Sequence, residues 1–178
     1  MADKVLYIAH VGSDGLLNKP SLEALSCAKN LVGAMNAEFA VGIFGEDTSK
    51  AIEQIGSCGA GQFLTISGAE YKDAKYASDA FAVEAICSKS QASIVIAAGT
   101  SRNCRVLPGV AYRVEGSIET HASEVATEGG SVTVKRWIYR QRMESVVSRV
   151  HRPWFIVVDS GNYSAWTGAS AAVSVEQI

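Results

Sequence analysis

The chain has 178 residues, of which 48% are hydrophobic and 19% charged, and its formal net charge is −2. This length suits one globular domain with a substantial buried core. No apolar run approaches the roughly 20 residues that a membrane-spanning helix needs, and the first apolar run, directly after Lys4, is too short for a signal peptide. We therefore expect a cytoplasmic protein with no membrane span, and the slightly negative charge predicts no binding to nucleic acid.

The positions of cysteine and arginine carry further information. The four cysteines are widely spaced, without a CxxC pair or a nearby His, which excludes a zinc site of the usual spacing and gives no disulfide framework. All eight arginines fall between Arg102 and Arg152, whereas the basic residues before them are lysines. Because the planar arginine fork suits phosphate and carboxylate groups, we expect a basic face in the second half of the chain.

Four rounds of strand followed by helix fill the first two thirds of the chain. The predicted strands are 4–9, 37–44, 63–66 and 93–98, and the predicted helices are 20–35, 48–55, 73–88 and 106–114. The strands are apolar almost throughout rather than alternating, which is typical of a parallel sheet covered on both faces. The pattern predicts an α/β fold, a three-layer α/β/α arrangement with a mostly parallel sheet.

The pattern changes after residue 115. Predicted strands Ser117–Ala126 and Ser131–Tyr139 flank Gly129-Gly130, a strong hairpin signal, and strands 144–150 and 154–159 follow. The fold is thus expected to finish with a C-terminal β extension. Residues 162–178 are rich in Ser, Ala and Gly. We therefore predict a domain over residues 1–161 and a tail or docking segment over residues 162–178.

Several polar residues follow predicted parallel strands, where ligands bind in open α/β sheets. His10 ends the first strand, and Thr100, Ser101 and Arg102 follow the fourth. The backbone N–H groups of this second cluster lead into a helix and could hold an anion. An equally good interpretation is that Thr100 or Ser101 caps the helix. For His10, anchoring of a loop is the favoured interpretation.

A second candidate set lies in the predicted β extension. Arg136, Arg140 and Arg142 are separated by even numbers of residues along one predicted strand and should therefore point to one side of the sheet. They could meet an anionic ligand or an acidic partner surface, or simply guard a solvated edge strand. On the first interpretation, replacing Arg136 and Arg140 with Ala should weaken binding without lowering stability. Cys104 lies between two arginines, which could lower the pKa of its thiol, but no base accompanies it, so no catalytic residue is expected.

Motifs spread along most of the chain resemble those of one family. They are Val5–His10 followed by Pro20-Ser-Leu-Glu-Ala-Leu25, then Gly99-Thr-Ser101 with Pro108, then Val134–Arg140, and finally Val157–Tyr163. In this order and spacing they resemble the N-terminal domain of electron transfer flavoprotein alpha subunits, over residues 4–163. In that family a second domain with the principal flavin-binding loops follows, and the present chain ends where it would begin.

The resemblance implies a role in flavin-mediated electron transfer together with a beta-type subunit. FAD would be shared with that partner, and His10, Thr100, Ser101, Arg102, Arg136 and Arg140 would be the cofactor-binding residues, with no catalytic residue and no metal. The resemblance also implies the adenine nucleotide alpha hydrolase-like form of the three-layer fold. Two alternatives stay open: a stand-alone module that binds an adenine nucleotide such as AMP, and a structural subunit that forms a homodimer.

Overall fold

The computed structural model describes residues 3–178. The described helices are α1 (Lys19–Met35), α2 (Ser49–Ile55), α3 (Tyr76–Ser90) and α4 (Ser101–Arg113), with two short 3-10 turns at Gly56–Cys58 and Ala69–Tyr71. The described strands are β1 (Lys4–His10), β2 (Glu38–Gly45), β3 (Gln62–Ser67), β4 (Ile94–Ala98), β5 (Ser117–Glu128), β6 (Ser131–Ile138), β7 (Met143–Val147), β8 (Trp154–Val158) and β9 (Glu176–Gln177).

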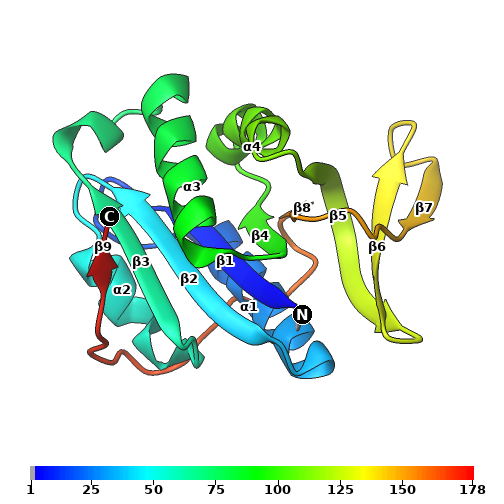
Figure 1. Cartoon of the computed structure of the whole chain (residues 1–178), viewed down its shortest axis with the longest axis horizontal. Coiled ribbons are helices and arrows are strands. Elements are labelled where there is room, and N and C mark those ends of the chain that lie inside the picture. Colours follow the sequence, from blue (N-terminus) through cyan, green and yellow to red (C-terminus); the bar gives the residue numbers. More distant parts are fainter. Residues whose placement is uncertain (1–2) are drawn as a thin grey trace.

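All nine strands join one sheet in the order β7-β6-β5-β8-β4-β1-β2-β3-β9. Every neighbouring pair from β5 to β9 is parallel, and only the β5–β6 and β6–β7 pairs are antiparallel. Helices α3 and α4 cover one face and α1 and α2 the other (Figure 1). The structure therefore confirms the predicted three-layer α/β/α fold with a mostly parallel sheet.

Burial explains why the central strands are apolar throughout. Side chains of β1 alternate between two cores: Val5 and Tyr7 pack with helix α1, whereas Leu6 and Ile8 pack with α3 and α4. Every residue of β4 and β8 is buried. A strand with helices on both faces has no side that tolerates polar residues, so the continuous apolar runs in the sequence correspond to the sheet centre.

The C-terminal strands divide between the edge and the centre of the sheet. Strands β6 and β7 extend it outward, and we call residues 131–147, which hold these strands and their connecting turn, the arm. In Figure 1 the arm stands at the end of the sheet farthest from β9. Strand β8 instead returns inward and pairs in parallel with both β4 and β5. This return places the carboxyl end of β8 beside that of β4.

Helices α1 and α4 begin at residues whose side chains cap them, and α4 corrects the prediction. The side chain of Asn18 accepts a hydrogen bond from the N–H of Ser21 and starts α1, as Pro20 had indicated. Thr100 starts α4 in the same way, through the N–H of Asn103. The prediction that this helix begins at Val106 was therefore wrong by five residues. Pro108 lies inside the helix, although a proline has no backbone N–H to donate and therefore usually marks a helix boundary.

The arm also differs from its prediction. The Gly129-Gly130 hairpin is present, with both glycines at positive φ, but β6 ends at Ile138 rather than Tyr139. The next three residues, 139–141, all adopt positive φ (48°, 55° and 62°) and form the turn into β7. Arg136 therefore lies on a strand and Arg140 in a turn. The prediction that they share one strand was therefore wrong.

Residues 162–178 run back across the domain. The N–H of Trp166 donates to the Leu22 carbonyl oxygen, and the N–H of Ala171 donates to that of Glu53. The chain then forms β9, whose Glu176 pairs with Leu64 of β3. This segment thus docks on its own domain and adds the last strand at that edge of the sheet. Within residues 3–178, no helix has the length and apolar character to cross a membrane.

A buried carboxylate holds the start of this segment. Glu23 of α1 is only 2% exposed, and one of its oxygens accepts hydrogen bonds of 2.8 Å from the Ser160 hydroxyl and the Gly161 N–H. Burial acts to raise the pKa of Glu23, but these two donors and the nearby Lys19 outweigh it and leave the pKa below its usual value. The folded state therefore favours the ionised form of Glu23.

We expect Glu23→Gln to lower the free energy of unfolding at pH 7 by about 1–2 kcal/mol, because the amide loses charge-assisted bonds. The contribution of Glu23 is present above its ordinary pKa of about 4.3 and is lost as the pH falls through the lower pKa of the folded state. Urea unfolding of both proteins between about pH 7 and pH 3 tests this. The difference should shrink with acid, and the exposed control Glu38→Gln should show none.

Candidate functional site

The carboxyl ends of the parallel strands carry a row of polar side chains. His10 ends β1, and Thr100 follows the neighbouring strand β4. The two side chains approach to 3.3 Å between His10 Nε2 and Thr100 Oγ1. Strand β1 connects to β2 on its other side, so this pair lies where the strand order reverses, the usual ligand crevice of an open α/β sheet. The structure thus brings these two candidate residues together.

The His10 ring is held neutral. Burial lowers its pKa, and the positive charge of Arg102 lowers it further. Its Nε2 forms a hydrogen bond with the Thr100 hydroxyl, and the same hydroxyl oxygen accepts from the N–H of Asn103. Thr100 therefore both caps helix α4 and contacts His10. Ser101 is the first residue of α4 and is exposed.

Arg102 forms a buried ion pair. Its Nε and Nη2 donate to the two oxygens of Asp79 at 2.8 and 2.6 Å, and Nη2 also donates to the Tyr71 carbonyl oxygen at 2.8 Å. The guanidinium lies 5.4 Å from the centre of the Phe44 ring. Asp79 is fully buried. Because its donors are taken up inside the fold, Arg102 joins α4 to α3 and has little left to offer a ligand.

Arg136 is also paired. It donates to one oxygen of Glu119 on β5 at 2.5 Å, and Arg149 donates to the other at 2.6 Å. Glu119 is 2% exposed. The Nε of Arg136 is buried without a hydrogen-bond partner among the described residues. Arg136 therefore has a structural partner and a buried donor that no described residue uses.

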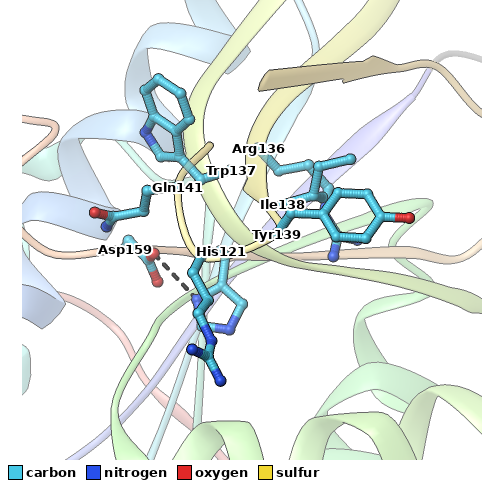
Figure 2. A pocket seen from close by; sticks show the side chains of 8 residues that line it. His121, Arg136, Trp137, Ile138, Tyr139, Gln141 and Asp159 are labelled. Carbon is cyan, nitrogen blue, oxygen red and sulfur yellow. Dashed lines mark hydrogen bonds and ion pairs between the residues drawn. The ribbon is translucent and has the colours of Figure 1, made fainter. Parts of the chain in front are cut away.

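A pocket of about 560 Å³ lies between the arm and the carboxyl end of β8. Its wall is formed by His121, Arg136, Trp137, Ile138, Tyr139, Arg140, Gln141 and Asp159. We call it the arm pocket (Figure 2). Arg140 has no ion pair or hydrogen bond to another side chain among residues 3–178, so its guanidinium is available to a ligand. Of the six residues singled out in the sequence, Arg136 and Arg140 line this pocket.

Two residues of the arm pocket were missed in the sequence. His121 and Asp159 face each other in Figure 2, with 3.2 Å between His121 Nδ1 and Asp159 Oδ2. Asp159 follows the buried strand β8, so the strand-end rule that singled out His10 could have found it. His121 lies within β5, where the register to β8 shifts between Glu119 and Ala122. Such a bulge redirects a side chain, and here the sequence around His121 has no glycine that would have indicated it.

Residues 5–178 match the family model of the electron transfer flavoprotein domain. The chain belongs to this family. No curated protein matches it. The match agrees with the resemblance carried by the sequence motifs, and it extends beyond Tyr163 to the last residue of β9 and Ile178. The electron transfer flavoprotein domain therefore includes the segment that docks back on the sheet.

The thiol of Cys104 in this electron transfer flavoprotein domain ionises less readily than an ordinary cysteine thiol. Burial raises its pKa, and the negative charge of Asp159 raises it further. The expectation that the neighbouring arginines lower this pKa was wrong, because Arg102 is turned toward Asp79. Among residues 3–178 no cluster of His, Cys, Asp and Glu could hold a metal ion.

Proposed function

We propose that the chain is an electron transfer flavoprotein subunit of the alpha type, which pairs with a beta-type subunit in the cytoplasm and serves flavin-mediated electron transfer. The match to the electron transfer flavoprotein domain over residues 5–178 is the observation that carries this proposal. The order of the alpha-type motifs supports the choice of subunit. On this proposal the chain makes and breaks no bonds; its residues position a flavin and a partner.

The arm is the surface that we assign to the partner. The arm and the five residues that follow it (148–152) together hold six of the sixteen Lys and Arg residues of the chain but only one of its eighteen acidic residues. The edge strand β7 exposes Met143 (54%) and Val146 (56%). A free strand edge with exposed apolar side chains and basic neighbours suits a partner whose facing surface is acidic.

FAD is the cofactor implied by the family, and we propose that it is shared with the partner. Two features of the arm pocket fit such a group: the unpaired guanidinium of Arg140 and the buried, partnerless Nε of Arg136. Both are donors for phosphate or ring oxygens. When bound, FAD supplies the electron-accepting ring. His10 and Thr100 would line the same edge of the sheet.

Co-expression with a beta-type subunit tests the proposal. We expect a yellow complex whose affinity falls about tenfold or more in the double variant Met143→Asp/Val146→Asp, because charges replace the apolar contact. Phe81→Asp is the matched control, since Phe81 is exposed on α3, away from the arm. Co-purification and the flavin absorbance are the measurements.

Three other results would contradict the proposal or part of it. A colourless chain that does not bind the beta-type subunit but is stabilised against heat by AMP would favour the adenine-nucleotide module. The supporting observation for that module is the position of the His10–Thr100 pair where the strand order reverses. A concentration-dependent homodimer without nucleotide binding would favour the structural subunit. Equal loss of partner binding in the Phe81→Asp control would remove the arm from the interface.

A further inference from the structure

Residues 162–178 close a pocket at the end of the sheet farthest from the arm. We call these residues the returning segment; it passes α2 and ends in β9 beside β3 (Figure 1). Helix α2 with the residues before it, strand β3 and the returning segment each supply part of the wall, and we call the space between them the segment pocket. Its volume of about 400 Å³ lies within the usual range for small-molecule sites.

Backbone contacts fix the returning segment in this wall. The N–H of Ala171 donates to the Glu53 carbonyl oxygen of α2 at 3.1 Å. The N–H of Ile178 donates to the Thr65 carbonyl oxygen of β3 at 2.9 Å. Gly56, which follows α2, approaches the segment so closely that a Cβ at this position would collide with the Ala171 carbonyl oxygen. The three parts of the wall are therefore joined within the fold.

Two buried threonine hydroxyls in the segment pocket lack a partner. Thr48, directly before α2, is 7% exposed, and Thr65 of β3 is 4% exposed. Thr48 occupies the N-cap position of α2 but forms no side-chain cap bond. Within residues 3–178 neither hydroxyl forms a hydrogen bond, although the Ser67 hydroxyl in the same wall accepts one from Gln177. Because a buried hydroxyl without a partner costs free energy, these two groups point to a bound molecule that supplies the missing bonds.

The charges of the segment pocket are negative. Asp47 and Glu53 belong to its wall, and no lysine, arginine or histidine of residues 3–178 does. Lys50 lies between them in the sequence, but its side chain lies against Gly15 and lines a different pocket. Asp47 accepts from the N–H of Ser49 and so offsets the positive end of α2, whereas the Glu53 carboxylate has no ion pair within residues 3–178. The pocket therefore favours a cation and repels an anion.

Apolar side chains complete the wall. Ile52 of α2 is buried, and Val173 of the returning segment packs against the same core cluster. Val175 lies farther along the segment and is 40% exposed. The two hydroxyls, the carboxylate and these apolar side chains together suit a molecule with one positively charged end and one apolar part.

We propose that the segment pocket binds a small organic cation, in which an ammonium group is carried by a short apolar body. The ammonium group donates to the hydroxyl oxygens of Thr48 and Thr65 and faces the carboxylate of Glu53. The apolar body packs against Ile52 and Val173. This site goes beyond the proposed function, because it lies at the opposite end of the sheet from the arm and requires neither flavin nor a partner.

Titration of the isolated chain, followed by NMR, tests the site with three probes of one shape. Phenethylamine, phenethyl alcohol and hydrocinnamate share the phenylethyl group and carry an ammonium, a hydroxyl and a carboxylate group. At pH 7 we expect the amine to bind with a dissociation constant of about 1–10 mM, about threefold more tightly than the alcohol and about tenfold more tightly than the acid. The amide signals of Thr48, Thr65 and Val173 should shift. No shift at about 20 mM amine, or an acid that binds as tightly, would overturn the proposal.

Thr48→Val and Thr65→Val remove the two hydroxyls and keep the shape of the side chains. Each should weaken the binding of phenethylamine about threefold or more, because the ammonium group loses an acceptor. Since neither hydroxyl has a partner in the free chain, neither variant should lower the melting temperature. A lower melting temperature with unchanged affinity would show a structural role and overturn the site. Thr133→Val, which changes a half-buried threonine on β6, is the control and should leave the affinity unchanged.

The charge of the site is tested by Glu53→Gln. It should weaken the binding of phenethylamine about threefold and leave that of the alcohol nearly unchanged. Glu46→Gln is the matched control: it removes the same charge nearby but from outside the segment pocket, and it should change the affinity about 1.5-fold or less at physiological salt. Equal losses in the two glutamate variants would overturn the assignment of the cation to this pocket. None of these measurements involves a beta-type subunit or a flavin, so a failure here and a failure of the proposed function are distinguishable.

Discussion

Replacing Arg102 with Ala is expected to lower the free energy of unfolding by about 3–5 kcal/mol, because it leaves the fully buried carboxylate of Asp79 without its ion-pair partner. The loss should appear in urea unfolding in the absence of any ligand. The second substitution Asp79→Asn, added to Arg102→Ala, should restore part of the stability, since a neutral amide is less costly to bury than a charge.

This pair of variants separates a structural role of Arg102 from a role in binding. If Arg102 were a ligand residue, the single variant would lose affinity at nearly unchanged stability, and Asp79→Asn would rescue nothing. Arg105→Ala serves as the control, because Arg105 is exposed on the same helix and donates only to the Ala74 carbonyl oxygen. A control that loses as much stability as Arg102→Ala would contradict the ion-pair argument.

The layers of the fold could be predicted because they depend on local sequence. Strands buried on both faces have to be apolar throughout, and this pattern marks β1, β2 and β4 without any knowledge of the rest. The Gly129-Gly130 turn was equally visible, because both residues need positive φ. The place of β8 between β4 and β5 was not predicted, since strand order depends on contacts between distant segments.

The candidate site could not be predicted from local sequence patterns. Arg102 and Asp79 are 23 positions apart, so their ion pair could not be found by spacing, and Arg102 therefore looked available. The turn of Tyr139, Arg140 and Gln141 contains none of the residues that favour positive φ. A continuous strand was the natural prediction there. His121 was hidden in the same way, because a bulge without glycine leaves no mark in the hydrophobic pattern.

The attachment of the arm leads to the second large effect. Glu119 on β5 accepts from Arg136 on β6 and from Arg149 after β7, so one buried carboxylate joins three segments. Either arginine alone can still neutralise Glu119. We therefore expect Arg136→Ala and Arg149→Ala each to cost about 1–2 kcal/mol of unfolding free energy, and the double variant to cost about 3–5 kcal/mol, more than their sum.

The double variant should lose more unfolding free energy than the two single variants together. This additional loss is the free energy of leaving the Glu119 carboxylate buried without a positive partner. Adding Glu119→Gln to the double variant should therefore recover stability, whereas Glu119→Gln in the intact chain should lower it. Urea unfolding of the six proteins completes this thermodynamic cycle. Additive losses, or a triple variant no more stable than the double, would show that the arginines act separately. Cooperative losses would show that Arg136 holds the arm to β5 through Glu119.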